Sequence, residues 1–245
     1  MTLAHPTAVL PLRALGLPTT AMVIGSMVPD IPVFVNWHEG YRLSHSVPGI
    51  FTIDLVMAVA VTALWFLAVR EAVVDMAPSA VRVRLQPRIR PTSEMWWLTL
   101  PAAALGSITH LVWDSFTHVG KWGPRHIAWL ADEHGPLLGL KWAQYVSGGV
   151  GLLVVTWVAA LHLRSLAPLP EPRPRRLLPV VVLPAVVGAA LVVGLVAAYR
   201  HRAYGFIDMA FDGVVHSLIA LAALGALACL GWHVVHAAVA ASDAM

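Results

Sequence analysis

The chain has 245 residues, of which 58% are hydrophobic and only 12% are charged, and its formal net charge is +3. Soluble globular domains have about 45–50% apolar and about 25% charged residues, so this composition excludes an ordinary soluble domain and indicates a membrane protein. The single cysteine, Cys229, allows no disulfide within the chain and no zinc site built from cysteines, so we expect it to serve packing.

The first 29 residues are apolar, but they do not form one uninterrupted run. Pro11, Gly16 and Pro18 break the helical pattern, and Arg13 places a charge inside it. Two short helical pieces of this kind are typical of a broken or re-entrant hairpin and not of a single span. No basic residue precedes the apolar run and no clear cleavage site follows it, so we do not expect a signal peptide.

Five later stretches are long enough to cross a bilayer, which requires about 20 apolar residues. The predicted fold is all-α, a polytopic transmembrane helical bundle with about five spanning helices and an N-terminal broken or re-entrant helical hairpin. We expect the spans near residues 50–69, 95–117, 142–161, 178–199 and 213–235.

The placement of arginine predicts the orientation. The loops at 70–94 and 162–177 carry five and four arginines, which together are nine of the 16 basic residues. The positive-inside rule makes these loops cytoplasmic, and the connections 30–49, 118–141 and 200–212 then lie outside, although they hold six basic residues. We divide the chain into a metal-site membrane domain at 1–165, a proline- and arginine-rich cytoplasmic linker at 166–177 and two C-terminal transmembrane helices at 178–245.

The stretch THLVWDSFTH, residues 109–118, places three ionisable groups at the end of an apolar run. His110, Asp114 and His118 are spaced four apart, and this spacing puts them on one face of a helix. An ionised aspartate at the centre of a bilayer costs at least about 2.5–3.5 kcal/mol, so such a group needs a partner or a wet cavity. A divalent metal suits imidazole and carboxylate together, and the alternative is a buried hydrogen-bond ladder without metal.

Other polar residues are predicted at the same outer face of the membrane. Asp30 and His45 lie in the connection before the first span, and His5 opens the hairpin that must emerge near Asp30. Each signal is weak alone, because the Pro-Asp pair could be a turn and either serine of the Ser-His-Ser stretch could be an N-cap. Their joint placement at one membrane face favours a metal site. Secondary candidates at this face are Asp54, His126, His134, Asp212 and His216.

Four motifs together resemble a known group of sequences. They are HP at 5–6, GSMVPDIP at 25–32, SHS at 44–46 and THLVWDSFTH at 109–118. This set resembles an uncharacterised bacterial membrane family related to inner-membrane metal-dependent hydrolases of the YdjM type. The resemblance covers residues 1–165 and implies a multi-pass protein of the bacterial cytoplasmic membrane, and the placement of the arginines predicts that its site faces the outside.

A more distant resemblance is to the all-helical zinc-dependent phospholipase C and S1/P1 nuclease fold, whose members hold three zinc ions with histidines and aspartates. The order of ligands in that fold is similar to the order of His5, Asp30, His45, His110 and Asp114, with His118 or His126 as the next ligand. The family's His-x3-Glu pair is missing, and the nearest substitute is Asp212 with His216 in reversed order. This departure implies one or two metal ions and not three.

These features predict a membrane-embedded metal-dependent hydrolase, a phosphoesterase on a lipid or lipid-linked envelope substrate at the outer leaflet. Two divalent ions about 3.5–4 Å apart would polarise a phosphoryl oxygen and lower the pKa of a bridging water, with Asp114 or Asp30 as the catalytic bridge. We expect zinc, with manganese as the alternative, in one or two ions, and membrane lipid but no nucleic acid as a partner. The predicted metal ligands are His5, Asp30, His45, His110, Asp114 and His118, and the cations predicted to hold the substrate are Arg42, Lys121 and Lys141.

Two other classes of function compete with this hypothesis. One is a non-catalytic membrane protein whose polar stripe is a structural polar or metal site. The other is a cation or proton transporter, which is less favoured because a transport path needs polar residues through the whole membrane thickness. Here the polar residues cluster at one end of the spans, and the inner halves are valine, leucine and alanine.

Overall fold

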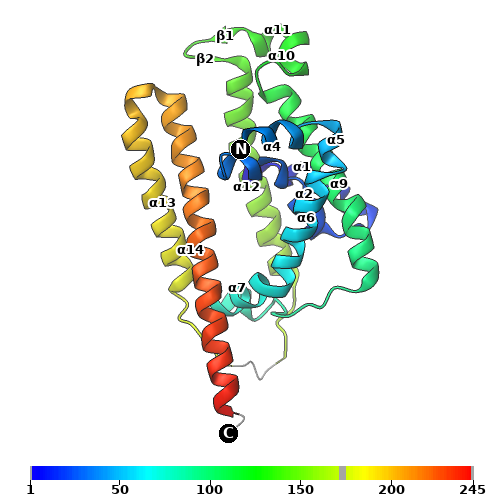
Figure 1. Ribbon diagram of the computed structural model, residues 1–245, viewed down its shortest axis with the longest axis vertical. Helices are drawn as coiled ribbons and strands as arrows, with labels where there is room; N and C mark the ends of the chain where they lie inside the picture. Colours follow the sequence, from blue (N-terminus) through cyan, green and yellow to red (C-terminus); the bar gives the residue numbers. More distant parts are fainter. Residues whose placement is uncertain (1, 171–174, 244–245) are drawn as a thin grey trace. The chain divides into compact units, whose positions relative to one another are not determined.

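The computed structural model describes residues 2–170 and 175–243 and confirms the all-α fold (Figure 1). The one sheet in these residues is a hairpin of two short strands, β1 (Glu133–His134) and β2 (Leu137–Leu138). Five helical segments are long and apolar enough to cross a membrane, as the apolar runs predicted. They are Val47–Met76, Ser93–Thr117, Gly139–Ser165, Val182–Tyr204 and Phe206–Asp243.

The chain divides into two compact units by its internal contacts. The first contains the described residues up to Ala63 together with Pro91–Ser165, and the second contains Leu64–Arg90 and the described residues after Ser165. Residues 64–90, which the sequence division placed in the first domain, therefore group with the C-terminal helices. Part of the predicted linker, residues 171–174, lies outside the described residues.

The N-terminal part of the first unit is broken into short helices, as expected. Prolines occupy the first turn of several of these pieces, where the missing N–H costs nothing, and each new proline ends the piece before it. The apolar stretch Thr19–Phe34 is shorter than the span of about 20 residues that a bilayer requires. The pieces are η1 (Thr2–Ala4), α1 (Pro6–Val9), η2 (Pro11–Leu15), α2 (Thr19–Gly25), η3 (Val28–Asp30) and α3 (Ile31–Phe34).

The rest of the first unit consists of longer helices and their connections. Ser46 caps α5 by accepting a hydrogen bond from Gly49 N at 3.2 Å, which confirms one of the two N-cap candidates in the Ser-His-Ser stretch. Thr92 caps α9 in the same way, through Met95 N at 3.2 Å. The elements are α4 (His38–Ser44), α5 (Val47–Ile50), α6 (Ile53–Leu64), α9 (Ser93–Thr117), α10 (Trp122–His126), α11 (Ala128–Ala131), the β-hairpin and α12 (Gly139–Ser165).

The short helix α2 lies directly against α9, backbone to backbone. A Cβ atom built on Gly25 would meet Ala103 O at 2.2 Å, and one built on Gly106 would meet Met22 O at 2.2 Å. No side chain larger than hydrogen fits at either position, so glycine is what allows the two helices to approach this closely. Ala103 is fully buried at the contact.

In the second unit, a buried carboxylate joins distant parts of the chain. Asp75 Oδ1 accepts hydrogen bonds from Arg82 Nε and Nη2 at 3.1 and 2.9 Å, and its Oδ2 accepts from Leu177 N at 3.0 Å and Trp232 Nε1 at 2.9 Å. Cys229 packs beside Trp232 in the apolar cluster of this unit, as expected for a packing role. The elements are the π-helical segment η4 (Trp65–Val69), α7 (Arg70–Met76), α8 (Ser79–Arg82), α13 (Val182–His201), η5 (Arg202–Tyr204) and α14 (Phe206–Asp243).

Because α2 and α9 are in such close contact, we predict that one added methyl group at Gly106 clearly lowers the stability of the protein. Gly106→Ala forces a Cβ atom against the backbone of α2, which cannot move away as a flexible side chain could, and overpacking of this kind costs about 1–3 kcal/mol. We expect a clearly lower midpoint in thermal unfolding of the detergent-solubilised protein, followed by tryptophan fluorescence.

The matched control is Gly149→Ala in α12, where a Cβ atom meets nothing within 4 Å. Alanine is favoured over glycine in a helix by about 1 kcal/mol, so this variant should unfold at the same temperature or slightly above the wild type. Equal midpoints for the two variants would contradict the close contact.

Candidate metal centre

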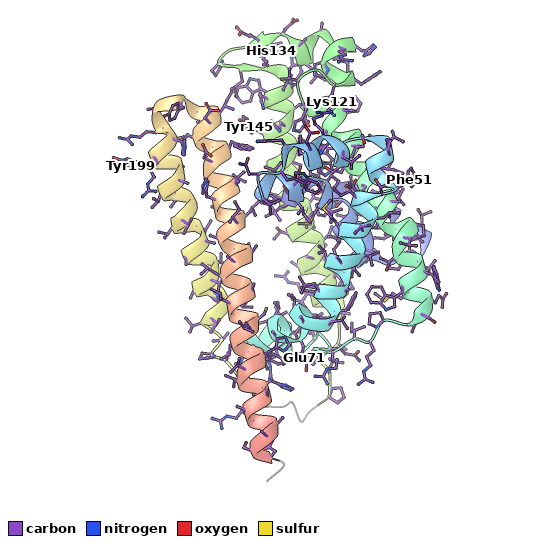
Figure 2. All side chains as sticks on the ribbon, in the orientation of Figure 1. Phe51, Glu71, Lys121, His134, Tyr145 and Tyr199 are labelled. Carbon is purple, nitrogen blue, oxygen red and sulfur yellow. The ribbon has the colours of Figure 1, made fainter. Side chains whose placement is uncertain are left out.

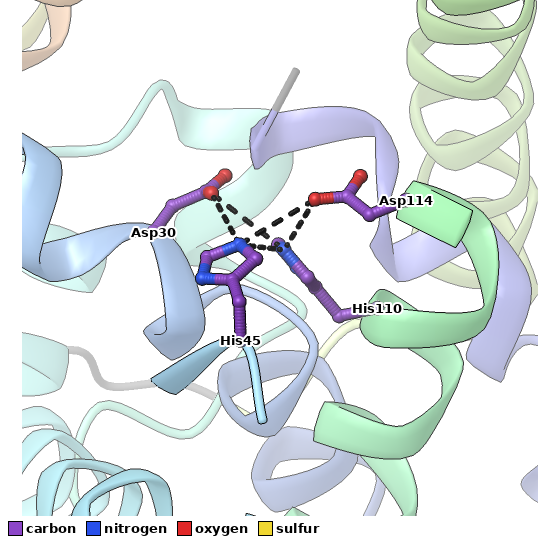
Figure 3. A group of neighbouring side chains, drawn as sticks. All are labelled: Asp30, His45, His110 and Asp114. Atoms are coloured by element: carbon purple, nitrogen blue, oxygen red, sulfur yellow. Dashed lines mark hydrogen bonds and ion pairs between the residues drawn. The ribbon is translucent and has the colours of Figure 1, made fainter. Parts of the chain in front are cut away.

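Four side chains from three separate segments meet in the first unit. Asp30 ends η3, His45 follows α4, and His110 and Asp114 lie one turn apart on α9 (Figure 3). One nitrogen or oxygen atom of each lies within 4.8 Å of the corresponding atoms of the other three. Asp114 is buried and His110 has no exposed surface, whereas Asp30 and His45 are half-buried. The side chain of Asp30 is 13% exposed and those of the other three are 5% exposed or less, so the group is enclosed.

Local hydrogen bonds hold the segments of this cluster together. Ser44 donates from its hydroxyl to Pro29 O at 2.8 Å, which places His45 beside Asp30. Ser107 donates to Gly25 O at 3.0 Å, at the end of α2. The last carbonyls of a helix have no partner within it, so these bonds satisfy groups that would otherwise be buried and unpaired.

Both histidines of the cluster have their ring protons placed by backbone carbonyls. His110 Nδ1 lies 2.8 Å from Ser26 O, and His45 Nδ1 lies 3.0 Å from Tyr41 O. A carbonyl oxygen only accepts hydrogen bonds, so Nδ1 carries the proton in each ring. In the neutral imidazole this leaves a lone pair on Nε2, and both Nε2 atoms point into the cluster (Figure 3). A histidine that binds a metal usually donates its other ring N–H in this manner.

Five of the six distances among the four atoms are close to the edges of a tetrahedron around an ion. A tetrahedral ion that binds nitrogen and oxygen at about 2.0–2.2 Å holds its ligand atoms about 3.3–3.6 Å apart. The Nε2 atoms of His45 and His110 are 3.3 Å apart. Asp114 Oδ2 lies 3.3 Å from His110 Nε2 and 3.5 Å from His45 Nε2, and Asp30 Oδ1 lies 3.6 and 3.7 Å from the same two atoms.

The cluster consequently requires a positive charge at its centre. Two lone pairs and two carboxylate oxygens converge, and none of the four is a donor unless an imidazole takes up an extra proton. Burial alone would raise the pKa of Asp30, but the neighbouring positive charges, first among them a protonated His110 imidazole, together with the Thr2 hydrogen bond hold that pKa below its ordinary value. A hydrogen-bond ladder would need that proton, whereas a divalent ion supplies the charge directly, so these four residues could hold a metal ion.

The second oxygen of Asp114 faces another pair of histidines. Asp114 Oδ1 lies 3.6 Å from His5 Nε2 and 3.4 Å from His118 Nδ1. The His5 ring stacks on His110 with ring centroids 3.9 Å apart, and its Nδ1 is buried without a hydrogen-bond partner among the described residues. The helix ends at Thr117, so His118 is an extended cap residue and not part of the helical stripe, yet it still reaches Asp114.

These two outer histidines are neutral at physiological pH. Burial, followed by the neighbouring His110, lowers the pKa of His5 to about 3. Burial also lowers the pKa of His118. Each neutral ring has one nitrogen lone pair, which a cation beside Asp114 Oδ1 would need at His5 Nε2 and at His118 Nδ1.

The three cations predicted to hold a substrate differ in their placement. Arg42 is exposed and pairs with Glu39 at 3.2 Å. Lys121 lies at the N-cap of α10 (Figure 2). Lys141 donates to Gln144 Oε1 at 3.0 Å, and the amide nitrogen of Gln144 lies 3.4 Å from His118 Nε2. Lys141 is therefore linked to Asp114 through Gln144 and His118. The contacts of Arg42 and Lys121 in the described structure provide no such link.

The secondary candidates do not belong to the four-residue cluster. Asp54 is fully buried on α6, and neither carboxylate oxygen has a hydrogen-bond partner of good geometry among the described residues. His126 stacks on Trp122 and His134 on Trp129, with ring centroids 4.8 and 4.6 Å apart. Asp212 and His216 lie in the second unit, where His216 Nδ1 bonds to the backbone oxygen of Asp212 at 2.8 Å.

Several partners of the cluster carry no sequence signal of their own. Ser26 and Tyr41 act through backbone carbonyls, which any residue provides. Thr2 donates its hydroxyl to Asp30 Oδ2, and a threonine so near the start of the chain is unremarkable in sequence. Gln144 is different, because a glutamine in an apolar span is uncommon and could have been singled out.

Removal of one ligand should abolish tight metal binding. We expect the purified protein to bind a divalent ion, and His110→Ala and Asp114→Asn to weaken that binding at least about 100-fold, since loss of outer hydrogen-bond partners alone costs 10–100-fold. His126→Ala removes an exposed histidine outside the cluster and is the matched control. Metal titration of the purified variants measures this. A wild type that holds no metal above background, or a control that loses as much, would refute the site.

The four residues of the cluster all lie within one family match. The family model "Domain of unknown function (DUF4184)" matches residues 1–238, which include both compact units. No curated protein and no solved structure matches the chain. With nearly the whole sequence covered by the model, the chain belongs to the DUF4184 family.

Proposed function

We propose that the protein is a membrane-embedded metal-dependent hydrolase, a phosphoesterase that acts on a lipid or lipid-linked envelope substrate. The observation that carries this proposal is the convergence of two Nε2 lone pairs and two carboxylate oxygens, with both ring tautomers set by backbone carbonyls. A structural hydrogen-bond network needs donors as well as acceptors, whereas these four atoms are all acceptors. A metal centre is built in this way.

Zinc is the metal that this ligand set favours, with manganese as the second choice. Two imidazole nitrogens and two carboxylate oxygens in tetrahedral array are typical of zinc, and manganese prefers more oxygen ligands. Asp30, His45, His110 and Asp114 would hold the first ion. Bound there with its coordination expanded to a fifth position, a divalent ion would supply polarisation of a phosphoryl oxygen and a water of lowered pKa.

The chain's own residues have separate tasks around that centre. Asp114 presents one oxygen to each pair of histidines and so ties the two halves of the site together. Asp30 has the most exposed side chain of the four, at 13%, so a water that its carboxylate orients would enter beside it. Lys141, joined to His118 through Gln144, can neutralise a phosphate that enters beside the histidines.

The depth of the site supports a lipid as the substrate. Asp114 lies three residues before the end of α9 at Thr117, which is about 4.5 Å from the end of the span. A carboxylate there lies near the headgroups and not at the bilayer centre. The phosphoester bonds of phospholipids occur at this depth, and exposed tryptophans nearby, Trp122 and Trp129, suit the same interfacial layer. The arginine-rich loops are expected on the cytoplasmic side, at the other end of the spans, so the site is expected at the outer leaflet.

The resemblances noted in the sequence support the same class of chemistry. The order of His5, Asp30, His45, His110 and Asp114 is that of the zinc-dependent phospholipase C and S1/P1 nuclease fold, and the motifs resemble the YdjM-type hydrolases. The missing His-x3-Glu pair favours one or two ions. His5 and His118 beside Asp114 Oδ1 would hold the second.

Hydrolysis should depend on the metal and on Lys141. Purified protein in mixed lipid–detergent micelles is expected to release phosphate or a phosphorylated headgroup from phospholipid, and a chelator should stop the release. Asp114→Asn should lower the rate at least about 1000-fold, because it removes a ligand shared by both halves of the site. Lys141→Met should raise KM or lower kcat about 10–100-fold, the worth of a charged hydrogen bond of about 1.5–3 kcal/mol.

Arg42→Met is the matched control for the lysine, because Arg42 is exposed and paired with Glu39. It should leave the rate unchanged. Metal binding without any chelator-sensitive hydrolysis over a panel of phospholipids and lipid-linked phosphates would leave a structural metal site and disprove the catalytic proposal.

The number of bound ions should change with His5. We expect His5→Ala to reduce the metal content by one ion per chain while the tighter site remains. The reason is that His5 forms an ion pair with Asp114 Oδ1 and only a ring stack with His110. Zinc analysis after dialysis measures the stoichiometry. Loss of all metal in this variant would show that the two halves do not bind separately.

A further inference from the structure

A groove runs along the helical hairpin of the second unit. It has a volume of about 260 Å³ and lies on α13 and α14, which run antiparallel (Figure 1). Aliphatic side chains of α13 between Val192 and Ala197 line one part of it. Arg200, His201 and His216 line the other part, and no carboxylate is among the lining residues. The groove thus joins an apolar surface to a basic one.

The basic end of this groove lies where a membrane helix ends. Helix α13 has 20 residues, and at 1.5 Å per residue it is about 30 Å long, close to the thickness of the hydrocarbon layer. Arg200 is the second-last residue of that helix, and Val192 lies two turns deeper, about 12 Å along the axis. Tyr199 projects from the same end of α13 (Figure 2), as is typical of the interfacial aromatic belt.

Arg200 is available to a ligand, whereas the nearby Arg202 is not. Within the described part of the chain, no hydrogen bond or ion pair occupies the Arg200 guanidinium. Arg202, by contrast, lies 3.8 Å above the Tyr199 ring and donates to Tyr199 O at 2.7 Å. An arginine at the membrane interface without an internal partner carries a permanent charge that a phosphate can accept in bidentate fashion.

The two histidines present their outer ring edges to the groove region. His201 Nδ1 faces Ala197 O at 3.1 Å and Asp212 Oδ2 at 3.5 Å. His216 Nδ1 faces Asp212 O at 2.8 Å. In both rings Nδ1 is occupied by the protein, and Nε2 has no partner among the described residues, so each ring donates to a phosphate from Nε2 when it carries a second proton. The carboxylate of Asp212 is taken up by His201 and does not line the groove.

We propose that this groove binds one anionic phospholipid of the surrounding membrane. Its phosphate lies against Arg200, with the two histidines beside it, and one acyl chain follows Val192, Val193 and Val196 into the hydrocarbon layer. A soluble phosphate would use the basic end alone and would leave the aliphatic part without a role. The inference shares no residue with the metal centre and does not depend on hydrolysis.

Native mass spectrometry of the full chain, released from detergent, tests the proposal. Dioleoyl-phosphatidylglycerol carries a net negative charge and dioleoyl-phosphatidylcholine carries none. We expect phosphatidylglycerol to bind at least about five-fold more tightly, and glycerol 3-phosphate, which has no acyl chain, to compete only at far higher concentration. Equal affinity for the two lipids, or equal competition by glycerol 3-phosphate, would overturn the proposal.

Variants identify the groove as the place of binding. Arg200→Gln should lower the affinity for phosphatidylglycerol about ten-fold and leave that for phosphatidylcholine unchanged, while Arg202→Gln, the matched control, should change neither. Val196→Phe keeps every charge and fills the aliphatic part, so it should weaken phosphatidylglycerol binding several-fold and serves if Arg200→Gln does not fold. Equal losses in Arg200→Gln and Arg202→Gln, or an unaffected Val196→Phe, would place the lipid elsewhere.

Discussion

The contact between α2 and α9 is the constraint from which the cluster of Asp30, His45, His110 and Asp114 follows. A helix end leaves carbonyl groups without donors, and in an apolar surrounding these groups must find partners from elsewhere. Gly25 and Gly106 let the two backbones approach until Ser107 and His110 can donate to the last carbonyls of α2. The same contact that completes the backbone hydrogen bonding therefore selects the proton position on a histidine ring.

That proton position determines the chemistry of the cluster. With Nδ1 of His110 committed to Ser26 O, only Nε2 faces Asp114, and His45 is committed in the same way to Tyr41 O. Four acceptors in one enclosed space repel one another unless a cation joins them. A cation that bound the folded cluster and not the unfolded chain would therefore stabilise the fold.

Much of the architecture was open to prediction, because its signals are local. Runs of apolar residues identify the spans, prolines at 11, 18, 29 and 32 break the N-terminal hairpin, and the spacing of His110 and Asp114 places both on one helix face. Serine before an apolar run indicated the cap of α5. In each case the relevant interaction joins residues within about one turn of each other, and a sequence pattern records it directly.

Long-range arrangement was harder to foresee. Nothing in the sequence distinguishes Lys141, which reaches His118 through Gln144, from Arg42, which pairs with Glu39 and stays exposed. The pair Asp212 and His216 has the spacing of a ligand pair, but the imidazole bonds to a backbone oxygen one turn earlier, which is a local alternative that spacing cannot exclude. Residues 64–90 group with the C-terminal helices, and Asp75, whose partners are far along the chain, makes some of the contacts that join them.

Asp75 also has a consequence for how the chain is made. Its carboxylate leaves the ribosome long before two of its partners, Leu177 N and Trp232 Nε1, have been synthesised, while Arg82 follows almost at once. During that interval Arg82 is the one of these partners that has been synthesised. Asp75 Oδ2 gains Leu177 N only about a hundred residues later, and Trp232 Nε1 only with the last helix. The hydrogen bonding of the Asp75 carboxylate is therefore complete only after Trp232 of the last helix has been synthesised.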